Sequence, residues 1–213
     1  MQVDIWSDIV CPWCYLGKRR FEKALAEFDG RDDVRISHRS FQLDPTRARG
    51  ETFSRRDMLR SKYRLSEDQV RAMDVKMEQT ASVDGLEYHL TEAGLTGNTL
   101  DAHQLVHLAA SHGREDPMLE RLYQAYFTEQ RSIFDLESLV KIAAEAGLDA
   151  MEVREALESN RYVDAVTRDL NESKSLGVTG VPFFVIDHRY GISGAQATDV
   201  FSRALKMATE PRA

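Results

Sequence analysis

The 213-residue sequence has only two cysteines, two tryptophans and five prolines, and it contains no apolar run of 18 residues. Two cysteines are too few for a small disulfide-stapled scaffold, and the missing apolar run excludes a membrane-spanning helix. The first eight residues lack a basic stretch followed by an apolar one, so we expect no secretory signal. Positive charge is also in deficit, with 28 basic against 35 acidic residues, which argues against nucleic-acid binding. We therefore expect a cytoplasmic protein whose partners are neither membranes nor nucleic acids.

The composition is that of an ordinary globular protein, with 42% hydrophobic and 30% charged residues. A chain of this length buries roughly 70% of its extended surface on folding, so it needs neither disulfides nor a metal for stability. The length fits one domain, or one domain that carries a large insertion.

The periodicity of apolar residues predicts the order of helices and strands. Strands are expected at 3–7, 34–41, 183–187 and 190–192. Helices are expected at 14–28, 55–63, 67–83, 99–112, 117–129, 136–146, 150–160, 163–176 and 196–207. No strand is expected between residues 52 and 160. Start signals precede several of these helices, namely Ser66 with Gln69 as a capping box, Thr99, Asp116-Pro117 and Asp135.

Strands 3–7 and 34–41 need the apolar strand 183–187 to complete a sheet, so the chain between them must leave the sheet and return. Residues 1–44 and 161–213 are therefore predicted to form one domain, and residues 45–160 an inserted all-helical domain.

The two cysteines form a single Cys11-Pro12-Trp13-Cys14 motif where a strand gives way to a helix. Free amides at the start of a helix stabilise a thiolate, so we expect Cys11 to be an exposed nucleophile with a lowered pKa. Cys14 lies one turn further on and faces inward, where it can resolve a mixed disulfide on Cys11. Trp13 covers the short bridge with an aromatic surface.

Two other interpretations of this motif are open. The cysteines could form a zinc site with His103 and His107, but 89 residues separate Cys14 from His103 and a proline after the first cysteine favours redox chemistry. They could also be two inert buried thiols. We expect no metal.

A second motif, Gly180-Val181-Pro182, stands directly before the apolar strand 183–187. Because proline cannot donate to a ladder, Pro182 belongs at the first residue of the strand or in a tight turn. The spacing alone does not favour a cis peptide bond, which is a minority state at X–Pro.

Together these motifs resemble the thioredoxin superfamily, and within it the DsbA-like branch that includes FrnE-type proteins, 2-hydroxychromene-2-carboxylate isomerases and kappa-class glutathione transferases. The resemblance covers essentially the whole chain and implies an α/β thioredoxin-like fold with a large all-helical insertion. The segments that carry it are Ser7–Gly17, Gly97–Thr99 with Ala102-His103, Gly180–Phe184 and Ile192–Gln196.

The resemblance implies that Pro182 is cis and packs across from Cys11, and that the Val181 backbone offers its N–H and C=O to an extended substrate. It also implies that Asn98, Thr99 and His103 on the insertion overlook the cysteines. Val181, Pro182, Trp13, Asn98 and His103 are thus candidate substrate-binding residues. The alternative for His103 is a histidine satisfied within the core.

The chain departs from the superfamily pattern at two positions. Thioredoxin and DsbA have a buried carboxylate six residues before the first cysteine, where this chain has Ile5. The nearest acid is Asp8, which either relays a proton for Cys14 or caps the turn. The isomerase and transferase members typically have serine in place of Cys11, so two cysteines favour disulfide exchange.

The sequence therefore predicts a thiol–disulfide oxidoreductase acting on protein or small-molecule thiols and disulfides. The alternatives are a glutathione-dependent isomerase or transferase acting on a small aromatic metabolite, and a non-catalytic binding module. No bound cofactor is expected, glutathione is a candidate co-substrate, and a homodimer is one open oligomeric state.

Overall fold

The structure is a computed structural model that describes residues 1–92 and 94–210. It divides into two compact units. Met1–Leu43 and Arg168–Ala213 form the first, here called the sheet unit, and Asp44–Thr167 form the second, the inserted unit. The boundary at residues 43–44 comes after a strand. The boundary at residues 167–168 falls inside a helix, α8 (Val163–Ser175).

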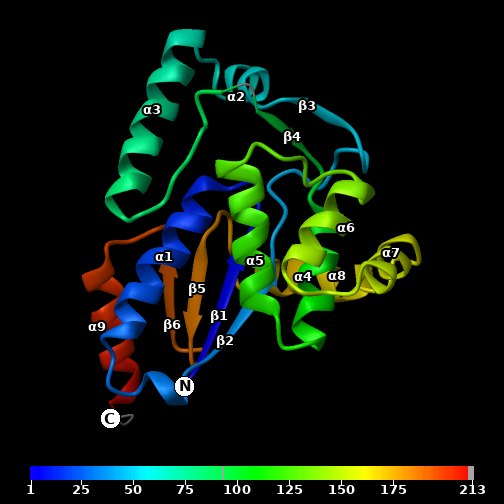
Figure 1. The fold of residues 1–213 in the computed structure, drawn as a ribbon. Coiled ribbons are helices and arrows are strands. Elements are labelled where there is room, and N and C mark those ends of the chain that lie inside the picture. The colour runs from blue at the N-terminus through cyan, green and yellow to red at the C-terminus, as the bar shows by residue number, and fades with distance from the viewer. Residues whose placement is uncertain (93, 211–213) are drawn as a thin grey trace. The chain divides into compact units, whose positions relative to one another are not determined.

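The sheet unit is built on four strands in the order β2-β1-β5-β6 (Figure 1). Its elements are β1 (Gln2–Ser7), α1 (Pro12–Ala26), the 3₁₀ turn η1 (Arg31–Asp33), β2 (Arg35–Ser40), β5 (Phe183–Ile186), β6 (Tyr190–Ser193) and α9 (Thr198–Thr209). β1 is central, because it pairs in parallel with β2 and antiparallel with β5. β6 completes the sheet antiparallel to β5. The predicted thioredoxin-like fold is confirmed.

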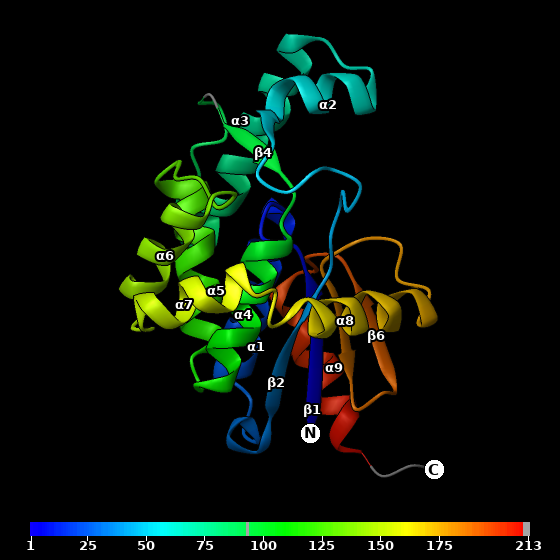
Figure 2. The same ribbon diagram turned by 90° about the vertical axis from the view of Figure 1, so that its right-hand side faces the viewer.

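Helices α1 and α9 cover one face of this sheet, and α8 lies on the other face (Figure 2). On the side of α1 and α9, three phenylalanine rings join the helices to β5. The Phe21 centroid lies 5.6 Å from Phe184 and 5.8 Å from Phe201, and Phe184 and Phe201 are 4.7 Å apart. This cluster fixes α1, and hence the cysteines at its start, on the sheet.

A polar network holds α8 on the opposite face. Asp169 of α8 accepts a hydrogen bond from the Ser40 amide at 2.9 Å, and its carbonyl oxygen accepts one from Trp6 Nε1 at 3.1 Å. Arg39 lies 2.8 Å from the buried Asp4 carboxylate and 3.5 Å from that of Asp169. The buried carboxylates of Asp4 and Asp169 thus both have partners, as they must, because burying an unpaired charge is costly.

The inserted unit is mostly helical. Its elements are β3 (Thr52–Ser54), α2 (Arg55–Tyr63), α3 (Glu67–Val83), β4 (Leu95–Gly97), α4 (Leu100–Ser111), α5 (Glu115–Tyr123), the π-helix η2 (Gln124–Thr128), α6 (Leu136–Glu145) and α7 (Ala150–Glu158), followed by the first turn of α8. No helix within residues 1–92 and 94–210 combines the length and the apolarity that crossing a bilayer requires.

The expectation that residues 52–160 contain no strand is wrong. β3 and β4 pair antiparallel, with Phe53 opposite Thr96. Each strand has only three residues, which is too short for a period-two pattern to be recognised in the sequence.

Two of the predicted helix starts are confirmed. Ser66 and Gln69 form the reciprocal capping box of α3, and the Asp135 side chain accepts from the Ser138 amide at the start of α6.

Of the two other start signals, Asp116-Pro117 is misplaced, whereas Thr99 is the N-cap residue of α4 as predicted but lacks a capping side-chain hydrogen bond. α5 begins at Glu115, so Pro117 occupies its third position, where the backbone N–H has no helical partner in any case. Thr99 precedes α4 but makes no side-chain cap. The Asn98 side chain takes that role, accepting from the Leu100 amide at 2.8 Å.

Candidate active site

Cys11 is the N-cap residue of α1, and Pro12 is the first helical residue. A short turn joins the helix to β1, since the Cys11 amide donates to the Asp8 carbonyl oxygen at 3.1 Å. The Cys14 amide in turn donates to the Cys11 carbonyl oxygen at 2.9 Å. Both cysteines are free thiols, placed one helical turn apart as the motif predicts.

The expectation that Cys11 is exposed is wrong. Cys11 is 5% exposed and Cys14 1%, while Trp13 between them is 48% exposed. Cys11 is covered because its sulfur points at the chain before β5, where the thiol donates to the Val181 carbonyl oxygen at 3.6 Å. Trp13 is therefore the most exposed residue of the motif.

The Cys14 thiol is held in its protonated form. Burial is the largest cause that raises its pKa, followed by the hydrogen bond to Cys11 and the charge of Cys11. The Asp8 backbone acts in the opposite direction through a hydrogen bond, and the Asp8 charge raises the pKa further. At neutral pH Cys14 is thus a neutral thiol beside Cys11.

Asp8 is buried, with 1% of its surface exposed. Its Oδ2 atom accepts a hydrogen bond from the Leu43 amide at 2.8 Å. The carboxylate therefore ties the end of β1 to the chain that follows β2. Its charge also reaches Cys14, as the raised pKa of that thiol indicates.

The chain opposite the cysteines is fixed by α1 and by the end of β6. The Val181–Pro182 peptide bond is cis. A Cβ atom at Gly17 would lie only 2.8 Å from Pro182 Cγ, so the helix needs glycine there for Pro182 to pack against it. The Pro182 carbonyl oxygen accepts from the Gly194 amide at 2.8 Å.

Asn98 and His103 belong to the inserted unit. Asn98 donates through Nδ2 to the Arg47 carbonyl oxygen at 2.6 Å, and its Oδ1 atom accepts from the Leu100 amide at the start of α4. His103 lies within α4 and is 3% exposed. Asn98 thus has a structural role in the inserted unit, and His103 is buried within it. The proximity of both side chains to the cysteines stays a prediction.

Sequence reasoning missed three residues that support Pro182 or its neighbours, namely Gly17, Arg20 and Gly194. Gly17 and Gly194 lie within segments that carry the family resemblance, and Gly17 has a further signal, because a glycine inside a helix is costly and often marks a close approach. In the part of the chain that the structure describes, no three His, Cys, Asp or Glu side chains gather as a metal site would require.

The fold and this cysteine site define a thioredoxin-like protein of the DsbA type. The chain belongs to the DSBA-like thioredoxin domain family, whose model matches residues 2–206. The predicted resemblance to the DsbA-like branch is confirmed.

Two relatives match nearly the whole chain. The chain is 29% identical to the YwbO protein of Bacillus subtilis over 208 residues, 96% of each chain. It is 48% identical to the crystal structure of a probable DsbA oxidoreductase, SCO1869 from Streptomyces coelicolor, at a TM-score of 0.95, covering 100% of this chain and 92% of that one.

Two more distant structures share the fold. The cytosolic disulfide reductase DsbM from Pseudomonas aeruginosa, solved with GSH, has a TM-score of 0.67 at 16% identity and covers 97% and 98% of the two chains. A 2-hydroxychromene-2-carboxylate isomerase has a TM-score of 0.67 at 17% identity, covering 97% and 95%.

Proposed function

We propose that this protein is a thiol–disulfide oxidoreductase in which Cys11 is the nucleophile and Cys14 the resolving thiol. One observation carries the proposal: two free thiols lie one turn apart at the start of α1, with the sulfur of Cys11 against the Val181 carbonyl oxygen. A helix N-terminus favours a thiolate at its cap position, whereas burial keeps Cys14 protonated.

The exchange proceeds in two steps that balance. The Cys11 thiolate attacks one sulfur of a substrate disulfide, forming a mixed disulfide and releasing the other sulfur as a thiolate. Cys14 then loses its proton and attacks the Cys11 sulfur, which forms the Cys11–Cys14 disulfide and releases the second substrate thiolate. The substrate gains two electrons, and the dithiol loses two. The reverse sequence oxidises a dithiol substrate, so the reduction potential of the pair sets the direction.

The substrate-binding part of the proposal concerns the surface around Cys11. The Val181 carbonyl oxygen lies against the Cys11 sulfur, and we propose that the Val181 backbone, the Pro182 ring and the exposed Trp13 form the wall that receives the substrate. An extended peptide can hydrogen-bond to the Val181 backbone as an added strand. Asn98 and His103 are proposed to contribute from the inserted unit.

Asp8 is proposed to relay the proton of Cys14. Its carboxylate is buried and its charge acts on the Cys14 thiol. A carboxylate near a protonated thiol can accept the proton when the thiol attacks. The Leu43 amide, which donates to Oδ2, keeps the carboxylate in place.

Glutathione is the proposed co-substrate, and the cytoplasm the proposed location. The fold is shared with a cytosolic disulfide reductase solved with GSH, and glutathione keeps thiols reduced in the cytosol. Two glutathione molecules would reduce the Cys11–Cys14 disulfide and leave as glutathione disulfide, which closes the cycle. The further partners proposed are protein or small-molecule thiols and disulfides.

The experiment that tests the proposal traps the mixed disulfide. Reduced Cys14→Ser protein mixed with glutathione disulfide should accumulate one glutathionyl group on Cys11, seen by mass spectrometry, because no resolving thiol remains. The wild type should pass through to its internal disulfide, and Cys11→Ser should form no adduct at a comparable rate. A wild type that exchanges with neither glutathione disulfide nor a peptide disulfide would refute the function.

The same variant separates the alternative function. A glutathione-dependent isomerase or transferase needs at most one of the two thiols, so Cys14→Ser would spare turnover of a 2-hydroxychromene-2-carboxylate while abolishing dithiol exchange. This protein shares its fold with such an isomerase, but the presence of both cysteines favours thiol–disulfide exchange.

A further inference from the structure

We propose that Arg20 is a positioning residue for the exchange reaction, holding the 193–196 loop that fixes the Val181–Pro182 backbone against Cys11. The inference rests on the proposed function, since it concerns the wall of that same site. Arg20 does not touch the reacting sulfur atoms in this argument, and it acts through two hydrogen bonds and one packing contact.

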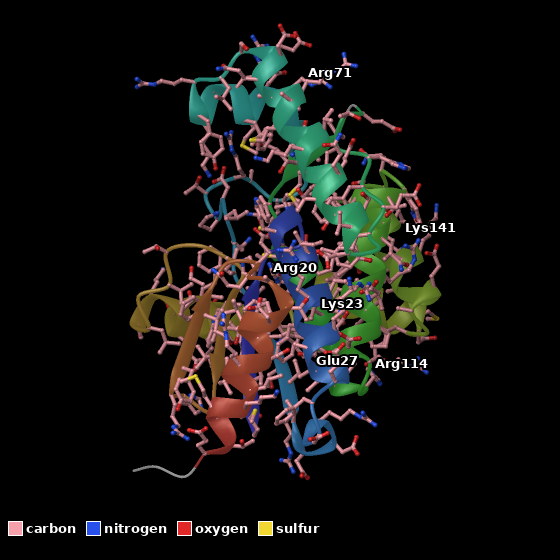
Figure 3. The ribbon with its side chains drawn as sticks, turned by 90° about the vertical axis from the view of Figure 1, so that its left-hand side faces the viewer. Arg20, Lys23, Glu27, Arg71, Arg114 and Lys141 are labelled. Carbon is pink, nitrogen blue, oxygen red and sulfur yellow. The ribbon has the colours of Figure 1, made fainter. Side chains whose placement is uncertain are left out.

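The first link joins α1 to the loop. Arg20 lies on α1, and Figure 3 shows Lys23 following it on the same helix and Glu27 just past the end of that helix. Its Nη1 atom donates to the Ala195 carbonyl oxygen at 2.8 Å, in a partly buried position. A hydrogen bond from a charged donor is stronger than one between neutral groups, so this contact is well suited to hold a loop.

The second link joins the loop to Pro182. The Gly194 amide donates to the Pro182 carbonyl oxygen at 2.8 Å. Gly194 has a φ of +81°, a conformation that favours glycine. Gln196 closes the loop on itself, because its amide donates to Gly194 and its side chain to Ser193. A shift of Ala195 should therefore also shift Pro182, because the Gly194 amide links the loop to the Pro182 carbonyl oxygen.

The third link is direct packing. A Cβ atom built on Gly17 would lie 2.8 Å from Pro182 Cγ and 3.5 Å from Ala195 Cα. Both Pro182 and the loop thus rest against the helix that begins at Cys11. α1 carries the nucleophile at its start and, one and a half to two and a half turns later, the two supports of the opposite wall.

This arrangement predicts a particular kinetic change. If Arg20 only stabilised the fold, its loss would lower the melting temperature without a selective effect on substrate affinity. If it positions the Val181–Pro182 backbone, its loss should weaken binding of an extended disulfide substrate and leave the chemistry of Cys11 unchanged.

The test compares Arg20→Ala with the wild type, using a peptide disulfide as substrate. We expect KM to rise about three- to tenfold, the equilibrium equivalent of one lost hydrogen bond, with kcat unchanged. Arg20→Lys keeps a charged donor and should restore part of the affinity. Alkylation of Cys11 by iodoacetamide needs no peptide binding, so it should not slow in Arg20→Ala, and it should speed up if the Val181 segment that covers Cys11 loosens.

Lys23→Ala is the matched control, since it removes one positive charge from the same helix and should leave KM unchanged. Hydrogen exchange at the Gly194 amide gives a readout independent of catalysis, and it should speed up about three- to tenfold in Arg20→Ala. Should Arg20→Ala fail to fold, Arg20→Gln removes the charged donor to the Ala195 carbonyl oxygen while keeping a polar side chain, and it should raise KM likewise.

An unchanged KM in folded Arg20→Ala, an equal rise in Lys23→Ala, or no rescue by Arg20→Lys would overturn the inference. An inactive wild type with faster Gly194 exchange in Arg20→Ala would instead refute the proposed function and leave the loop contact established.

Discussion

The Cys11 sulfur lies 3.6 Å from the Val181 carbonyl oxygen, although 170 positions separate the two residues in the sequence. The contact joins the start of α1 to the segment before β5, and both segments flank the central strand β1. The sheet therefore brings the two parts of the site together. The cysteine turn follows β1, and the Val181 segment precedes β5, the strand that pairs with β1.

The two thiols should differ in reactivity at neutral pH. Burial and the neighbouring Cys11 raise the pKa of Cys14, so Cys14 stays a thiol and reacts slowly. Brief treatment of the reduced protein with iodoacetamide, followed by peptide mapping, should show Cys11 modified well before Cys14. Faster labelling of Cys14 would reverse the assigned roles.

Removing the charge of Asp8 should make Cys14 more acidic. The Asp8 charge raises the pKa of Cys14, so Asp8→Asn should lower it, and the thiolate should appear at lower pH. The measurement is the pH dependence of Cys14 alkylation in a Cys11→Ser background, with and without Asp8→Asn. Asparagine retains an oxygen for the Leu43 amide, so the turn is preserved. A midpoint that stays the same or rises contradicts the prediction.

An ion network on the inserted unit should make its stability depend on pH. Arg131 and Arg121 lower the pKa of Glu145 by hydrogen bonding, and Arg121 likewise lowers that of Glu129. A depressed pKa contributes stability above the ordinary glutamate pKa of about 4.3, and this stability is lost as the pH falls below that value.

Urea unfolding at pH 7 and at pH 3.5 tests this network. Glu145→Gln should lower the midpoint at pH 7 and have less effect at pH 3.5. The change should be modest and should shrink in high salt, because the carboxylates are about two-fifths exposed. Glu27→Gln, at the exposed residue that follows α1 (Figure 3), is the control. An effect of Glu145→Gln that is equal at both pH values would rule out the proposed linkage.

The β5–β6 turn should be improved by one glycine. Asp187 and His188 have φ values of +49° and +52°, and the Arg189 amide donates to the Ile186 carbonyl oxygen at 2.9 Å. This is the geometry of a two-residue hairpin turn that favours glycine at its second position. His188→Gly should stabilise the protein by about 0.5–1 kcal/mol, seen as a higher melting temperature. His188→Ala keeps the strained backbone and should give no gain; equal melting of His188→Gly and the wild type would count against the turn assignment.

The sequence predicted the parts of the fold that have a clear local pattern. The alternation in β1 and β2 and the proline after Cys11 were enough to place a redox motif at a helix start. β3 and β4 were missed because three residues do not establish a period. Asn98 was considered only as a ligand contact, yet its side chain caps α4.

The site itself was harder to predict than the fold. Its cysteines lie three positions apart in the sequence, but Cys11 is covered by Val181, and Arg20 contacts Ala195. No local pattern in α1 indicates that Arg20 meets Ala195, because such contacts depend on how distant segments pack.

The central position of β1 has a consequence for biosynthesis. One neighbour of β1, β2, is made almost at once, but the other, β5, is separated from it by the whole inserted unit. At about 5–20 residues per second on a ribosome, β5 emerges roughly ten to forty seconds after β1. During that interval the nascent chain carries its cysteine pair without the Val181 segment that later covers Cys11, so we expect its thiols to select less among oxidants than those of the finished protein.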